Sequence, residues 1–135
     1  MVFFAIQKLD QRIDINDTTV QYDTVVYADT DVNLNQNGSI TFKHDDIYNV
    51  DVNLSLLLGS DEAARITCKL NGVNIPGAGL NINIGSTSTA NRASNFVVKA
   101  CKGDILSVTG TSSFGVQANV NNSNGAESSL RISRS

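Results

Sequence analysis

The sequence predicts an all-β protein in which two antiparallel sheets pack face to face, as a sandwich or jelly roll. Three observations predict this fold class: apolar and polar residues alternate along most of the chain, turn-forming residues separate the alternating segments, and no segment has the spacing of an amphipathic helix. Successive side chains of a strand point to opposite faces, so strict alternation gives one buried face and one exposed face. A chain of 135 residues and 14.4 kDa fits a single domain overall.

The most regular alternation lies in DIYNVDVNLSLLLG, residues 46–59. Its even positions carry Tyr48, Val50, Val52, Leu54 and Leu56. Polar residues fill the odd positions from 49 to 55. We therefore expect the even face to lie in the core, packed against Ile66, Phe96 or Leu130 from the other layer.

The same period predicts six further strands, in GSITF, ARITCKLNG, SNFVVKA, DILSVTG, FGVQANV and SSLRISRS. Asn-Gly pairs lie between expected strands at Asn37-Gly38, Asn71-Gly72 and Asn124-Gly125, and this pair suits the positive φ angles of tight hairpin turns. The small polar residues of GSTSTANRAS, residues 85–94, predict a long exposed loop instead.

The composition restricts the classes of partner. Hydrophobic residues make up 41% of the chain and charged residues only 17%, so the polar faces must be carried by neutral Asn, Ser and Thr. The net charge is −3, and no cluster of Lys and Arg provides the footprint of a nucleic-acid binder. No apolar run approaches the length of a membrane span. We expect neither a nucleic-acid partner nor a membrane partner.

The first residues, MVFFAI, lack a positively charged leader and a cleavage site, so we do not expect a secretory signal. We interpret residues 1–24 as an N-terminal strand or anchoring segment. A jelly-roll domain is expected over residues 25–135.

The two cysteines, Cys68 and Cys101, match no zinc, haem or redox spacing. Cys68 has the inward parity of its strand, where a free Cys behaves as a small hydrophobic residue. A disulfide between the two is the lesser alternative, and the sequence leaves their redox state open.

No catalytic constellation is visible, so we expect a non-enzymatic protein without a cofactor. His44 is the only histidine, and no motif gives it a nucleophile. The run His44–Asp46 could offer metal ligands, but adjacent residues of a strand point to opposite faces. Asp29 and Asp31 share a face and could hold calcium, although their segment lacks the Gly and Glu of an EF-hand. We expect no metal site, and whether a calcium ion is bound stays open.

Four pieces in order, with a fifth at the end, resemble a known superfamily: GSITF, IYNVDVNLSL, ITCKLNG and VVKACKGDILSV, then SSLRIS. The series resembles the tumour-necrosis-factor-like jelly rolls, which include the globular heads of the complement recognition subunit. In style it is most similar to bacteriophage and bacterial spore-surface members. The resemblance runs from about residue 25 to the end, and Asp46 stands where members often have Gly. The matched positions are Gly38 to Phe42, Tyr48 and Val50, Asn71-Gly72, and Gly103-Asp104.

The resemblance implies a homotrimer in which one sheet of each subunit packs around a three-fold axis. Candidate interface residues are large residues that lie off the inward parity or on the long early strand. They are Tyr22, Tyr27, Leu57, Val97 and Ile105. The alternative is that each makes an edge contact or anchors a loop within one subunit.

Among such proteins, a bare trimeric jelly roll fits a structural protein of a bacteriophage virion, one that decorates the capsid or forms part of a fibre. It would be made in the host cytoplasm and lie on the virion surface, bound to a capsid or tail protein. The N-terminal segment would then pack on the capsid or lock the base of the trimer. Its candidate anchoring residues are Val2, Phe3, Phe4 and Ile6.

The sequence leaves two other functions open besides the virion hypothesis. A glycan- or receptor-binding adhesion module would use loops 85–94 and 121–125, because loops at the end of a sandwich commonly carry recognition. The scarcity of aromatic residues, 6% with no Trp, disfavours sugar stacking. A hydrolase on a jelly-roll scaffold would need clustered His or a carboxylate pair in a cleft, and nothing in the sequence singles out such a pair.

Overall fold

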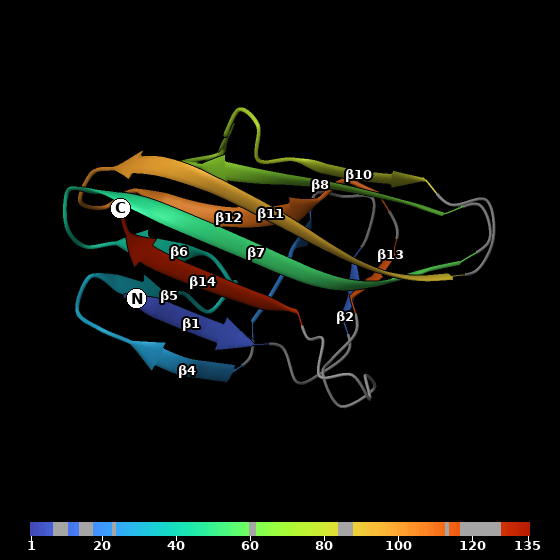
Figure 1. The fold of residues 1–135 in the computed structure, drawn as a ribbon, viewed down its shortest axis with the longest axis horizontal. Coiled ribbons are helices and arrows are strands. Elements are labelled where there is room, and N and C mark those ends of the chain that lie inside the picture. Colours follow the sequence, from blue (N-terminus) through green and yellow to red (C-terminus); the bar gives the residue numbers. More distant parts are fainter. Residues whose placement is uncertain are drawn as a thin grey trace.

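Two antiparallel sheets, each of seven strands in the described part of the chain, form a sandwich, so the predicted all-β sandwich is confirmed (Figure 1). The computed structural model describes residues 1–6, 11–13, 18–22, 24–59, 62–83, 88–112, 114–116 and 128–135. Sheet A contains β1 (Phe3–Ile6), β2 (Gln11–Ile13), β4 (Thr24–Ala28), β7 (Asp46–Leu58), β11 (Ser88–Ala100), β13 (Phe114–Val116) and β14 (Ser129–Arg134). Sheet B contains β3 (Thr18–Thr19), β5 (Val32–Leu34), β6 (Ile40–Phe42), β8 (Ala63–Leu70), β9 (Val73–Asn74), β10 (Leu80–Asn83) and β12 (Ile105–Gly110).

Strand β7 is the central element of sheet A. It pairs with β11 along one side over its full length, and with β14 and then β13 along the other. Strand β1 follows β14, and β4 lies at the end of that path. In sheet B, β12 is central and pairs with β8, β6 and β3. Figure 1 shows sheet A lying over sheet B, with the two termini at the same end of the molecule. In the part of the chain described, no helix is long and apolar enough to cross a membrane.

The even face of β7 is buried, as its alternation predicts. Tyr48, Val50, Val52, Leu54 and Leu56 all have exposed fractions of 1% or less. The ring of Tyr48 stacks on Phe42 of sheet B, with centroids 4.7 Å apart. Burial of this face contributes roughly 25 cal/mol for each Å² of apolar surface removed from water.

The predicted packing partners of β7 are only partly right. Ile66 does belong to the opposite sheet, on β8, and is buried. Phe96 and Leu130 instead lie on β11 and β14, beside β7 in the same sheet, where they pair with Val50 and Val52. Alternation tells which side chains point inward, but not which strands hydrogen-bond to each other.

Strand β11 is longer than the sequence predicts, and the expected loop over 85–94 is wrong for most of its length. Residues Ser88–Ser94 pair in register with Leu58–Val52 of β7. Their small polar side chains lack the alternation that marks a half-buried strand, but backbone pairing with a long neighbour requires no such pattern. Positions 85–87 lie outside the described residues, as does the predicted tip at 121–125.

The first strand belongs to the sandwich. Strand β1 pairs with β14 on one side and with β4 on the other, so residues 1–24 and 25–135 contribute to one sheet. Val2, Phe3 and Ile6 are buried in this chain's own fold, with Val2 and Phe3 in the main core cluster. Buried side chains cannot contact a capsid, so we correct the expectation that these three are anchoring residues.

Turn geometry follows the sequence at two of the three Asn-Gly pairs, and the third lies outside the described residues. Asn71 and Gly72 both have positive φ, 53° and 80°, as a tight hairpin turn between β8 and β9 requires. Gly38 has φ 88°, and a Cβ placed there would lie 2.8 Å from the Val20 carbonyl oxygen. Only glycine lets the 35–39 turn approach the segment before β4 so closely.

Two matched motifs, Asn71-Gly72 and Gly103-Asp104, contact each other in the fold. Asn71 Nδ2 donates to Asp104 Oδ1 at 2.9 Å, and the Ile105 amide donates back to Asn71 Oδ1 at 2.9 Å. The Cys101 amide donates to Asp104 Oδ2 at 2.8 Å. The bond from Cys101, and after it the bond from Asn71, lowers the pKa of Asp104 below its ordinary value of 3.8.

We therefore expect Asp104 to contribute to acid sensitivity. A lowered folded-state pKa stabilises the fold above the ordinary value of 3.8, and this contribution is lost as the pH falls through the folded-state pKa. The wild type should lose stability between pH 7 and about pH 3 more steeply than Asp104→Asn, which has no carboxylate there to protonate. Urea midpoints at the two pH values measure this, and equal losses in both proteins would contradict it.

Both cysteines are free, so the disulfide alternative does not hold. Cys68 is buried, and burial raises its pKa to about 12, whereas Cys101 is exposed after β11. The thiolate is the reactive form, so Cys101 should react with a chromogenic disulfide at neutral pH while Cys68 does not. We expect one fast thiol per folded chain and two per unfolded chain. Two fast thiols in the folded protein would show that Cys68 is accessible.

Candidate self-association surface

The side of sheet A that faces away from sheet B is the candidate site, and we call it the outer face of sheet A. The odd positions of β7 point to it, together with the residues paired to them on β11 and β14. Strands β1 and β4 extend it past β14. Its members include Phe4, Tyr27, Ile47, Asn49, Asp51, Asn53, Leu57, Asn95, Val97, Ser129, Arg131 and Ser133.

One row of side chains crosses the whole face, because strand register aligns five residues from five strands. Tyr27 pairs with Phe4, Phe4 with Arg131, Arg131 with Asp51, and Asp51 with Asn95. The Arg131 guanidinium carbon lies 4.2 Å from the centroid of the Phe4 ring, a cation–π contact. Asn95 Nδ2 donates to Asp51 Oδ1. The row is therefore aromatic at the β4 margin and polar at the β11 margin.

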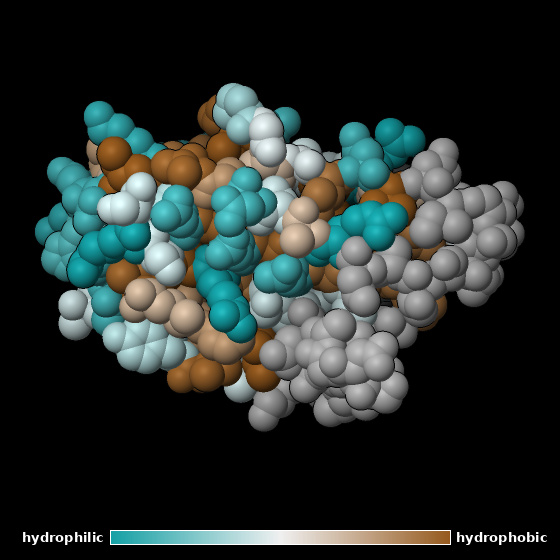
Figure 2. Space-filling view, in the orientation of Figure 1, coloured by the Kyte–Doolittle hydropathy of each residue, from teal (hydrophilic) through white to brown (hydrophobic). Residues whose placement is uncertain are grey.

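The centre of the face is rich in amides and hydroxyls. Asn53 lies opposite Ser129, and its Nδ2 donates to the Ser129 hydroxyl at 3.5 Å. Asn49 lies opposite Ser133 in the same ladder. Figure 2 shows this largely hydrophilic centre, with hydrophobic side chains gathering at the lower margin over β1 and β4. Such groups can make hydrogen bonds to another protein surface without burying a net charge.

Large apolar side chains on this face are exposed. The exposed fractions are 49% for Tyr27, 44% for Ile47, 39% for Leu57 and 56% for Val97. On strand β4, Val25 and Val26 add further apolar surface at the margin. Several exposed apolar residues on one face, among polar neighbours, are found at protein–protein contact sites.

The structure separates the five predicted interface residues into three groups. Tyr27, Leu57 and Val97 all lie on the outer face of sheet A, on three different strands. Ile105 is exposed on β12, so it points away from the sandwich on the opposite side, from sheet B. Tyr22 is buried in this chain's own core, so we correct its inclusion as an interface candidate. Its burial is intramolecular, as the edge or loop alternative supposes.

Several residues that form this face are not predicted by the sequence pattern. Phe4 was expected on a capsid, but it is half-buried against Arg131 on the outer face of sheet A. Asp51, Asn95 and Arg131 were not singled out at all. The available signal was that each of them lies at an odd position, next to the buried even positions of its strand. Parity does not tell which residues lie opposite each other on neighbouring strands. The row from Tyr27 to Asn95 therefore could not be predicted without the strand register.

A second polar group closes one end of the sandwich. Arg134 of β14 forms an ion pair with the buried carboxylate of Asp31, which precedes β5, and its Nε lies 3.5 Å from Asp46 Oδ2. The hydrogen bond to Asp31 raises the pKa of Arg134. His44 Nε2 lies 3.6 Å from Asp31 Oδ1. These contacts join the last strand of sheet A to the segments that flank β5 and β6 of sheet B.

The same polar group contains the residues that the sequence offers as candidate metal ligands. Asp29 Oδ1 accepts a hydrogen bond from the Asp31 amide at 2.8 Å, and the Asp31 carboxylate is paired with Arg134. The two carboxylates are therefore not both free to bind one calcium ion. His44 and Asp46 meet Asp31 and Arg134 instead. Across the described part of the chain, no three His, Cys, Asp or Glu residues are placed to hold a metal ion.

The fold is similar to the jelly rolls of a tumour necrosis factor and of a complement head. The structure is similar to that of Eiger TNF from S. frugiperda, with a TM-score of 0.70, 12% identity, and 99% of this chain and 92% of that chain covered. It is also similar to the globular domain of zebrafish complement 1qA protein, with a TM-score of 0.67, 10% identity, and 98% of each chain covered. No family model matches the sequence, and no curated protein matches it. The likeness to this superfamily predicted from ordered motifs is confirmed at the level of the fold.

Proposed function

We propose that the protein is a non-enzymatic homotrimer that assembles through the outer face of sheet A. The observation that carries this proposal is the concentration of exposed apolar residues there, with Tyr27, Leu57 and Val97 on one face of one sheet. Sheet B presents Ile105 and the hairpin residue Val73 on its own strands. The superfamily resemblance supports a three-fold arrangement in which one sheet of each subunit surrounds the axis.

The polar centre of the face fits an interface that also fixes orientation. The row from Phe4 to Asn95 contains one cation, one carboxylate and an amide, all anchored by neighbours in the same sheet. Anchored polar groups lose little side-chain freedom on association and set the register between subunits. The apolar margins would supply most of the buried hydrophobic area.

We further propose that the trimer is a structural protein of a bacteriophage virion, decorating the capsid or forming part of a fibre. Support comes from the resemblance to phage members and from the neutral surface, with only 17% charged residues. The partner would be a capsid or tail protein, and the site of action the virion surface. With Val2, Phe3 and Ile6 buried, only Phe4 of the four proposed anchoring residues retains exposed surface, and it lies on the outer face of sheet A.

Two measurements test the two levels of the proposal separately. Light scattering at micromolar concentration should give the mass of three 14.4 kDa chains, and a single-chain mass would overturn the trimer. Immunogold labelling of virions from the phage that encodes the chain should place it on the capsid or fibre. Unlabelled virions would overturn the virion role and leave the trimer standing.

The adhesion alternative no longer has the loop 85–94 as its contact site, because β11 begins at Ser88. Its second loop, 121–125, lies outside the described residues.

A further inference from the structure

Two opposite charges lie next to each other at the centre of the outer face of sheet A without forming an ion pair. Asp51 of β7 and Arg131 of β14 are direct partners in the strand register. They are the only charged residues among the outward, odd positions of these two strands. Within the described part of the chain, no ion pair involves either of them.

Contacts within the sheet draw the two side chains apart. The Arg131 guanidinium carbon lies 4.2 Å from the centroid of the Phe4 ring, so this side chain extends toward β1. The Asp51 carboxylate accepts a hydrogen bond from Asn95 Nδ2, so it is held on the other side, toward β11. A guanidinium has five N–H donors and a carboxylate has two oxygens, so both groups keep hydrogen-bonding capacity for a second partner.

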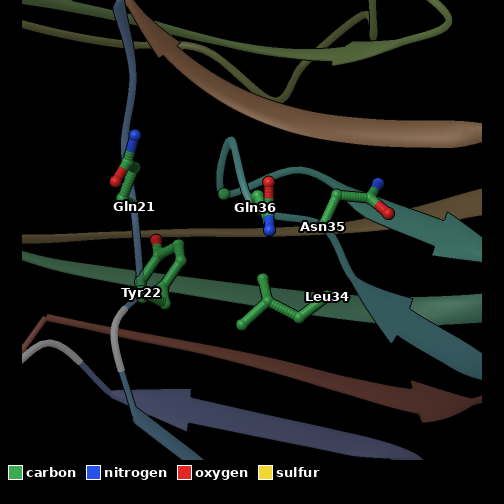
Figure 3. Close-up of a pocket in the computed structure, with 6 residues that line it drawn as sticks. Gln21, Tyr22, Leu34, Asn35 and Gln36 are labelled. Carbon is green, nitrogen blue, oxygen red and sulfur yellow. The ribbon is translucent and has the colours of Figure 1, made fainter.

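The unpaired charges lie on an open sheet surface and not in a cavity. A hollow of about 280 Å³ lies elsewhere, between the 35–39 turn and the segment that leads into β4. Figure 3 shows neutral side chains that line it, among them Tyr22, Leu34 and Gln36. None of its lining residues belongs to a strand of sheet A. The two charges can therefore be covered by a second protein surface, but not by a ligand in this hollow.

Assembly through the outer face of sheet A would remove both charges from water. A charge that is buried without a partner is strongly unfavourable, whereas a guanidinium and a carboxylate can share two parallel hydrogen bonds. Each chain contributes one cation and one carboxylate at this place, so three chains contribute equal numbers of the two. The face is therefore complementary in charge to a second copy of itself.

Three-fold symmetry brings unlike charges of different chains together. Asp51 and Arg131 lie in one row across the strands, so they are at the same level along the strand direction. Around an axis parallel to the strands, cyclic symmetry repeats the order of these two residues three times in the same sense. Each Asp51 is then next to the Arg131 of another chain, and no two like charges are neighbours.

We infer that Asp51 of one chain and Arg131 of the next form an ion pair across each of the three contacts of the trimer. The six groups form a ring of alternating sign around the axis, which fixes the orientation of the subunits. Phe4 and Asn95 hold the two groups apart within one chain, so each stays open to a second chain. The inference rests on the proposed trimer and names the polar contact at its centre.

A disulfide between chains tests the contact directly. Asp51→Cys and Arg131→Cys are made in separate chains that both carry Cys101→Ser, which removes the exposed native thiol and leaves the buried Cys68. Co-expression and oxidation should give a covalent dimer with one chain of each kind, and this bond must join two chains because each has only one new thiol. With Ile105→Cys, on the opposite sheet, in place of Arg131→Cys, the yield should fall to about a tenth or less.

Charge reversal measures how much the ion pair contributes to assembly. Arg131→Glu should raise the concentration at which half of the chains are trimeric at least about a hundredfold, and Asp51→Arg should do the same. The double variant restores the alternation of charge and should recover at least about tenfold of that loss. Arg65→Glu makes the same change at an exposed position of β8 in sheet B, and it should assemble like the wild type.

The results separate this inference from the proposed trimer. The inference is overturned if Arg131→Glu assembles like the wild type, or if the two cysteine variants form trimers without the mixed disulfide. Both outcomes leave the trimer standing. A wild-type protein with the mass of a single chain overturns the trimer and the ion pair together.

Discussion

Val97→Asp should convert the proposed trimer into folded single chains of 14.4 kDa. Val97 is 56% exposed on β11, opposite Asn49, so an Asp there is solvated in the isolated chain and should leave its fold intact. Assembly through the outer face of sheet A would bury three such carboxylates. The desolvation cost is several kcal/mol for each buried charge, and about 1.4 kcal/mol is a tenfold change in an association constant.

Ile105→Asp is the matched control for this substitution. Ile105 is 42% exposed on β12, so the same apolar-to-charged change is made on the opposite sheet of the sandwich. Light scattering on the two variants at equal concentration should give a single-chain mass for Val97→Asp and a three-chain mass for Ile105→Asp. Circular dichroism should show an intact β-sheet signal in both. A trimeric Val97→Asp protein, or a monomeric Ile105→Asp protein, would place the interface elsewhere.

Sequence patterns predicted which side chains face inward wherever one face of a strand is clearly apolar. On β7 the even positions from Tyr48 to Leu56 are all buried, as the alternation predicts, although Ser55 on the odd face is buried too. Alternation is reliable here because a one-residue slip would expose the entire apolar face. The turn at Asn71-Gly72 was predictable for an equally local reason, since few residues other than Asn and Gly tolerate positive φ.

Features that depend on pairing could not be predicted in the same way. The first half of β11 contains small polar residues, and its strand conformation comes from the ladder with Leu58–Asn53 of β7. Tyr22 is large and lies on the expected long early strand, which suggested an interface. It is instead buried in this chain's core.

The candidate surface likewise has features that the local sequence predicts and features that depend on strand pairing. Tyr27, Leu57 and Val97 were predicted individually because they are large and lie off the inward parity or on the long early strand. Their presence on one face follows from the strand order of sheet A, which places β4, β7 and β11 in one layer. Ile105 has equivalent sequence features but lies in the other layer. Only the sheet assignment distinguishes these two kinds of exposed apolar residue.

Leu106→Ala should strongly destabilise the core at sheet B, lowering the free energy of unfolding by roughly 2–5 kcal/mol. The Leu106 side chain is 1% exposed on the central strand β12, where its backbone pairs with both Leu70 of β8 and Ile40 of β6. Truncation removes apolar contacts and leaves a cavity that rigid neighbouring strands cannot close. A total stability of about 5–15 kcal/mol makes this a large fraction of the whole.

Ile105→Ala provides the closest control, because Ile105 is adjacent, is of the same size, and points to solvent from the same strand. We expect that change to cost less than about 1 kcal/mol, and both variants keep the outer face of sheet A intact. Urea unfolding at one fixed chain concentration measures both, since the stability of a trimer depends on concentration. Equal losses for the two variants would mean that Ile105 is covered in the assembled protein. In that case the outer face of sheet B, and not only that of sheet A, would have to contact another subunit.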